Sequence, residues 1–115
     1  MCSLLRREDD MEVAGECGTG EEAVAQAPQL CPDVVIMDVA LPGMTGVEAT
    51  RLIALALPHT RIVALSNHSG RSLVSAVLKA GGLGYVRKDH AFEELVPAIR
   101  SVYAGRRFLG LDIDD

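Results

Sequence analysis

Short apolar runs alternate along the chain with longer segments in which apolar residues recur every three or four positions. The runs are typical of buried strands, and they lie at residues 11–16, 33–38, 61–66 and 84–88. The periodic segments predict helices, which begin near Thr19, Gly46, Gly70 and Glu93. Each predicted strand is therefore followed by a predicted helix.

This alternation predicts an α/β fold in which a parallel sheet carries helices on both faces, giving three αβα layers. Consecutive parallel strands are expected to be joined by right-handed crossovers. Because 115 residues with 49% apolar side chains suffice for one core and not for two, residues 1–115 are expected to form one domain. Nothing in the last residues, LGLDIDD, indicates an output domain.

Two prolines modify the predicted helices. Pro28 is expected to end or kink the first helix. Pro97 would cost about 3 kcal/mol inside a helix, so the last helix is expected to start at Glu93, which puts the proline near its first turn. The core stripe expected for this helix consists of Phe92, Leu95, Val96, Ile99, Val102 and Tyr103.

Hydropathy and charge narrow the class of protein. The longest apolar run, at residues 52–57, is far below the ~18 residues that cross a bilayer, and no signal peptide opens the chain, so no membrane association and a cytoplasmic location are expected. The formal net charge of -5 disfavours contact with a phosphate backbone, so this segment is not expected to bind nucleic acid directly.

One polar residue ends each of three successive predicted strands: Asp38, Ser66 and Lys88. Ligands of parallel sheets gather at the carboxyl ends of the strands, so these three side chains are expected to converge on one crevice. A carboxylate can act as a nucleophile that forms an aspartyl phosphate, while a hydroxyl and an ammonium can bind the added negative charge. The trio therefore indicates phosphoryl transfer to Asp38.

At these residues the chain resembles the CheY-like, flavodoxin-fold receiver domains of two-component response regulators, most closely those of regulators with a LuxR-type helix-turn-helix. The matching segments are DVVIMDVALPGMTGVEAT around Asp38, RIVALSNH around Ser66, LKAGGLGYVRKD around Lys88, and the ending AIRSVYAGRRFL. The three motifs occur in the family's order and cover nearly the whole chain.

The resemblance implies a signalling protein that controls a transcriptional output and is not an enzyme. It implies that a histidine kinase phosphorylates Asp38, that Ser66 and Lys88 bind the phosphoryl group, and that Tyr85 is an aromatic switch. It further implies a homodimer and a Mg²⁺ ion. Asp38 and the backbone carbonyl of Ala40 would be an incomplete ligand set for that ion, so weak Mg²⁺ binding is expected.

The family's acidic pair at the end of its first strand has no clear counterpart. Asp9 and Asp10 precede the strand at Met11 too closely to leave the ~14 residues of a parallel crossover, so they are rejected as that pair. Residues 4–7 are interpreted as the tail of the family's first helix, and the first strand as missing. The gap in the sheet is expected to close up or to be filled by another chain through strand exchange.

Two alternatives to a phosphoacceptor function are considered. The absence of the acidic pair favours a receiver-like interaction module that cannot be phosphorylated. An enzyme of the haloacid dehalogenase-like phosphatase type is disfavoured, because it needs a second acid two residues after its nucleophile, where this chain has Ala40.

Overall fold

The fold is a six-stranded sheet with helices on both faces, seen in a computed structural model that describes residues 2–8, 10–39, 44–67, 70–111 and 113. For residues 2, 4–8 and 10–14 only the backbone is described. The strands are β1 (Cys2–Glu8), β2 (Asp10–Cys17), β3 (Val34–Asp38), β4 (Arg61–Ser66), β5 (Gly84–Arg87) and β6 (Phe108–Leu109). Their order across the sheet is β2-β1-β3-β4-β5-β6.

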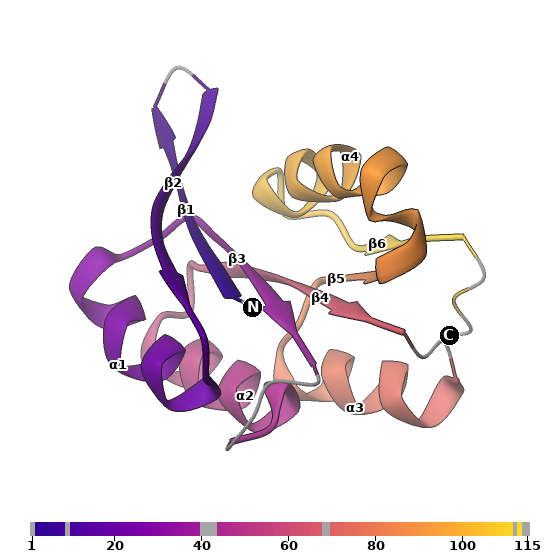
Figure 1. Cartoon of the computed structure of the whole chain (residues 1–115), viewed down its shortest axis with the longest axis horizontal. Coiled ribbons are helices and arrows are strands. Elements are labelled where there is room, and N and C mark those ends of the chain that lie inside the picture. The colour runs from indigo at the N-terminus through magenta and orange to yellow at the C-terminus, as the bar shows by residue number, and fades with distance from the viewer. Residues whose placement is uncertain (1, 9, 40–43, 68–69, 112, 114–115) are drawn as a thin grey trace.

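The helices form the two outer layers (Figure 1). Their bounds are α1 (Gly20–Leu30), α2 (Gly46–Ala56), α3 (Arg71–Ala80) and α4 (Ala91–Tyr103), with a short 3₁₀ turn η1 (Lys88–His90) before α4. The first three lie on one face of the sheet, and α4 lies on the other. The prediction of three αβα layers is confirmed.

The central strands are apolar because both of their faces are covered. Val34, Val35, Ile36 and Met37 of β3 are all buried. Val35 and Met37 pack towards α1 and α2, whereas Val34 and Ile36 pack towards α4, as the two-residue period of a strand requires. Strand β4 pairs in parallel with both β3 and β5, so three strand ends meet at one edge of the sheet.

The predicted gap in the sheet is filled by the chain's own first residues. β1 lies between β2 and β3 and pairs antiparallel with both, with Cys2 opposite Met37 and Leu5 opposite Val34. The interpretation of residues 4–7 as a helix tail is therefore wrong, and neither closing up nor a second chain is needed at this position. The expected strand at 11–16 is confirmed within β2, which runs parallel to β3.

The prolines do not end the helices as predicted. Helix α1 continues through Pro28 to Leu30 and ends at Cys31, whose φ of 46° is left-handed. Helix α4 begins at Ala91 rather than Glu93, so Pro97 lies in its interior.

The expected core stripe of α4 is half wrong. Ile99 and Val102 are buried, but Phe92 is 97% exposed, and Val96 and Tyr103 are also exposed. The buried face of α4 consists of Leu95, Ala98, Ile99 and Val102, so the helix is rotated such that Phe92, Val96 and Tyr103 lie on its exposed side.

Strand β6 was not predicted. It pairs in parallel with β5 and extends the sheet at that edge, with Gly84 opposite Phe108 and Tyr85 opposite Leu109. Phe108 packs towards α4 and Leu109 towards α3. Within the described part of the chain, no helix is both long enough and apolar enough to span a bilayer.

Candidate functional site

Asp38 is the last residue of β3 and lies at the carboxyl edge of the parallel strands. It is in register with Leu65 of β4, and the ladder continues one step further, because the Val39 amide donates to the Leu65 carbonyl at 2.9 Å. The Asp38 side chain is 15% exposed. The carboxylate thus sits at the rim of the core rather than in open solvent.

Lys88 reaches this carboxylate from the other side of β4. Its Nζ lies 2.7 Å from Asp38 Oδ2, and its side chain is 33% exposed. Lys88 is the first residue of the η1 turn rather than the last residue of β5, so the predicted strand 84–88 is one residue too long. The expected convergence of Asp38 and Lys88 is confirmed.

Ser66 and Tyr85 form a second pair at the same edge. Ser66 ends β4 and is 2% exposed, and Tyr85 on β5 is fully buried. Burial raises the pKa of the Tyr85 hydroxyl, and a side-chain hydrogen bond with Ser66 opposes part of that rise. Ser66 thus contacts the buried tyrosine from the end of β4, the strand that lies between β3 and β5.

The connection after β3 is fixed by close backbone packing. At Gly46, the first residue of α2, a Cβ atom would lie 2.5 Å from Val39 Cα and 2.8 Å from the Asp38 carbonyl oxygen. Thr45 caps this helix by accepting from the Glu48 amide at 3.2 Å. Only glycine lets α2 begin this close to the end of β3, so Gly46 positions the carboxylate.

Helix α1 also holds this connection. Glu21 Oε1 accepts a hydrogen bond from the Met44 amide at 2.9 Å, and this bond lowers the pKa of the Glu21 carboxyl. Sequence reasoning missed the role of Glu21, because the two residues are 23 positions apart and nothing local connects them.

The described side chains do not fit a Mg²⁺ ion. Asp38 is already paired with Lys88, and the described residues contain no group of three acidic, histidine or cysteine side chains able to hold a metal. Asp10 pairs with Glu8 at the turn end of the hairpin, beyond the amino end of β3. The rejection of Asp9 and Asp10 as the family's acidic pair stays a prediction, because Asp9, the Asp10 side chain and Ala40 lie outside what the structure describes.

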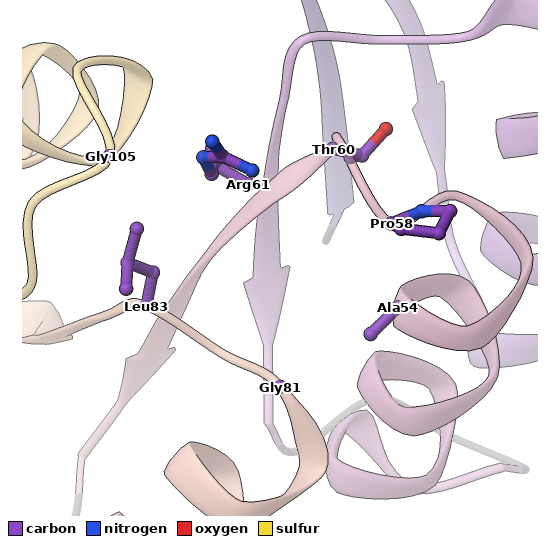
Figure 2. Close-up of a pocket in the computed structure, with 7 residues that line it drawn as sticks. All are labelled: Ala54, Pro58, Thr60, Arg61, Gly81, Leu83 and Gly105. Atoms are coloured by element: carbon purple, nitrogen blue, oxygen red, sulfur yellow. The ribbon is translucent and has the colours of Figure 1, made fainter.

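A pocket of about 210 Å³ lies at the opposite edge of the sheet, near the amino end of β4 (Figure 2). It is lined by Ala54, Pro58, Thr60, Arg61, Gly81, Leu83 and Gly105. None of these residues belongs to the Asp38 site. The candidate chemistry is therefore at the rim of the carboxyl edge and not in this pocket.

The fold and the strand-end residues agree with a comparison of protein families. The family described as "Response regulator receiver domain" matches residues 1–100, and the chain belongs to this family. These domains are signalling modules of two-component systems.

The closely related proteins include response regulators with known names. The chain is 43% identical over 103 residues to the response regulator UvrY of Escherichia coli (strain K12). The matched region covers 90% of this chain and 47% of UvrY. The chain thus spans about half the length of the curated relatives it matches.

Solved structures support the same assignment. A LuxR-family two-component response regulator from Aurantimonas sp. SI85-9A1 is 39% identical, with a TM-score of 0.83, covering 88% of this chain and 72% of that chain. The isolated receiver domain of RcsB from Salmonella enterica serovar Typhimurium, in the presence of phosphomimetic BeF₃⁻, is 26% identical, with a TM-score of 0.79, covering 89% and 76%. The predicted resemblance to LuxR-type receiver domains is confirmed.

Proposed function

We propose that residues 1–115 act as one phosphoacceptor receiver unit, in which a histidine kinase phosphorylates Asp38. The observation that carries this proposal is the 2.7 Å approach of Lys88 Nζ to Asp38 Oδ2 at the carboxyl edge of the sheet. A carboxylate at the rim is open to an incoming phosphoryl group, and the ammonium beside it can offset the charge that the group adds.

The transfer forms one bond and breaks another. A carboxylate oxygen of Asp38 attacks the phosphorus of the kinase phosphohistidine, the P–N bond breaks, and the imidazole keeps the electron pair and takes up a proton from solvent. The product is an aspartyl phosphate at Asp38. Lys88 would then pair with one phosphoryl oxygen. Ser66, the last residue of β4, would donate a hydrogen bond from its hydroxyl to a second phosphoryl oxygen.

Tyr85 is proposed to act as the switch. It is fully buried and hydrogen-bonded to Ser66, so a change in the position of the Ser66 side chain is felt by the tyrosine. Through Tyr85, a local charge event at Asp38 can alter the packing of the β5 edge.

The second candidate function is a receiver-like interaction module that is not phosphorylated. It is favoured by the direction of β1, because an antiparallel strand carries Glu8 and Asp10 to the edge opposite Asp38. The described residues around Asp38 then contain too few oxygen ligands for a divalent cation.

One experiment separates the two functions. The protein is incubated with acetyl phosphate over a range of Mg²⁺ concentrations, including none, and its intact mass is measured. The proposal expects a gain of one phosphoryl group that is absent in Asp38→Asn and retained in Asp33→Asn, a matched change at the other end of the same strand region. No gain at any Mg²⁺ concentration supports the interaction module.

We also propose that the unit forms a homodimer within a transcriptional regulator, as in a LuxR-type protein. The exposed apolar residues Phe92, Val96 and Tyr103 of α4 are a candidate contact surface. Exchange of β1 between chains is less favoured, because β1 already pairs within its own chain. Light scattering should give a dimer for the wild type and a monomer for Phe92→Glu.

A further inference from the structure

The pocket at the amino end of β4 lies at the edge of the sheet opposite Asp38. Figure 2 shows Arg61 and Leu83 on one side of it, and Pro58 and Ala54 on the other. Its volume of about 210 Å³ is below the ~300 Å³ at which pockets for drug-sized ligands begin. The pocket is therefore suited to a small organic molecule.

Two glycines at helix ends leave room for this pocket. Gly81 ends α3 with a φ of 113°, and a Cβ atom there would lie 2.7 Å from Ala54 Cβ. Gly105 follows α4 with a φ of 83°, and a Cβ atom there would lie 3.9 Å from Arg61 Nη2. Both conformations are left-handed and favour glycine, so the pocket is a consequence of how α3 and α4 end.

The lining is apolar apart from two side chains. Hydrocarbon groups come from Ala54, Pro58 and Leu83. The Thr60 hydroxyl donates to the Pro32 carbonyl at 2.8 Å, so its proton is already used within the chain. None of the described lining residues is acidic. The Arg61 guanidinium is thus the charged group that a ligand in this pocket would meet.

Arg61 has no carboxylate partner within the described part of the chain. Its Nη1 donates to the His59 carbonyl at 3.3 Å, which is a bond to a neutral oxygen. The guanidinium of Arg87, by contrast, donates to both carboxylate oxygens of Asp89 at 3.0 Å. Because a guanidinium carries five donors in a fork that matches a carboxylate, Arg61 retains donors for a ligand of that kind.

The helix ends beside the pocket carry partial negative charge on their last carbonyls, which would oppose an anion. Here the chain's own amides bond to such carbonyls. In α3 the Gly82 amide donates to the Val77 carbonyl at 2.9 Å. In α4 the Gly105 amide donates to the Val102 carbonyl at 2.9 Å. The helix ends therefore weigh less than a guanidinium in direct contact with the ligand.

We propose that this pocket binds a small aliphatic monocarboxylate of about the size of butyrate. The carboxylate pairs with the Arg61 guanidinium, and the hydrocarbon chain packs on Ala54, Pro58 and Leu83. A phosphate is disfavoured, because one guanidinium does not balance a dianion and the remaining oxygens would face hydrocarbon. The site shares no residue with the Asp38 site, so it does not depend on the phosphoacceptor function.

An NMR titration of the whole chain with sodium butyrate tests the proposal. The amide signals of Gly81, Leu83 and Gly105 should shift and saturate with a Kd that is roughly millimolar, as expected for a ligand of so few atoms. Acetate, which lacks two methylene groups, should bind about tenfold more weakly. Butanol and butylammonium, which lack the carboxylate, should give no saturating shift at these amides.

Two matched variants test the guanidinium. Arg61→Gln should weaken butyrate binding about tenfold or more, because a charge-assisted hydrogen bond is lost. Arg106→Gln removes the same charge from an exposed residue next to Gly105, and its Kd should stay within about twofold of the wild type. Circular dichroism checks that both variants are folded, and the ligand series on the wild type decides the proposal if Arg61→Gln is not.

Several results would overturn the proposal. They are equal butyrate affinity in Arg61→Gln and the wild type, and binding of butanol or acetate as tight as that of butyrate. Inorganic phosphate that shifts the same amides with the same Kd would show a general anion site instead. Shifts confined to Val39 and Ser66 would place the carboxylate at the Asp38 edge. Failure of Asp38 to accept a phosphoryl group, by contrast, leaves this proposal unchanged.

Discussion

The amino-terminal hairpin and the three central strands are held in the same sheet by different interactions. In β3, β4 and β5 most residues are apolar and buried, polar residues stand at the strand ends, and helices cover both faces. The hairpin of β1 and β2 contains the charged segment RREDDMEV and has a helix, α1, on one face. Packing thus specifies the central strands, whereas backbone pairing on both sides positions β1.

The difference explains where the chemistry lies. Asp38, Ser66 and Lys88 come from the strands, or the turn after a strand, whose position packing fixes. The hairpin contributes no described side chain to the site. The described side chains of the candidate site therefore all come from the central strands and the η1 turn.

The largest effect is expected from a core truncation in the central strands. Ile62 of β4 is fully buried, so Ile62→Ala should lower the free energy of unfolding by about 2–5 kcal/mol, because it leaves a cavity. Chemical denaturation measures the change.

The matching change in the hairpin is Ser3→Pro, which removes a backbone donor in β1. The loss cannot exceed the free energy with which the hairpin docks, so it should be smaller than that of Ile62→Ala. A decrease in the free energy of unfolding as large as that of Ile62→Ala would contradict the comparison. It would show that the hairpin and the central strands unfold as one cooperative unit.

The next largest effect is expected at Gly46. A methyl group there meets the backbone of Asp38 and Val39, so Gly46→Ala should destabilise the fold by about 1–3 kcal/mol and slow phosphorylation of Asp38. Gly70→Ala is the control, because a Cβ atom at Gly70 meets nothing within 4 Å. Equal denaturation midpoints for the two variants would show that the close packing of α2 against Asp38 and Val39 does not contribute to stability.

A smaller effect is expected from the ion pair at the site. Lys88→Met leaves the Asp38 carboxylate without this partner at the rim of the core, and the cost should be about 1 kcal/mol at low salt. Because salt screens a partly exposed pair, the difference from wild type should shrink as ionic strength rises. A cost independent of salt would point to lost packing of the lysine chain instead.

The smallest effect concerns pH. The pKa of Tyr85 is raised by burial, so the folded state disfavours its ionised form. The stability from this group is complete below the pKa of about 10 of an unfolded tyrosine and falls as pH rises above it. Denaturation midpoints between pH 9 and pH 11 should therefore fall less steeply in Tyr85→Phe, and equal slopes would speak against a buried hydroxyl.

The central strands could be predicted closely because their pattern is local. The prediction for β4 has the same bounds as the observed strand, and that for β3 is one residue too long. The strand-end rule for parallel sheets then brought Asp38 and Lys88 together correctly.

Strand β1 was missed because its sequence has no strong period and was interpreted from the family's element order. Residues 4–7 fit a helix tail only if a parallel first strand precedes them. An antiparallel strand needs no crossover, so a short turn after Glu8 is sufficient.

Other parts depend on contacts between distant residues. Segments that no local pattern connects are joined by the bond between Glu21 and Met44, the pair of Ser66 and Tyr85, and the hydrogen bond from the Leu111 amide to Glu94. The exposure of Phe92 and Val96 depends on how α4 rotates on the sheet, which apolarity alone did not decide.

The reversed direction of β1 has a practical consequence for laboratory work. Cys2 lies opposite Met37, next to the phosphoacceptor candidate, so an affinity tag fused at the amino terminus would emerge beside the edge that a kinase would approach under the proposed function. Phosphotransfer assays on this protein should therefore be carried out after proteolytic removal of any such tag.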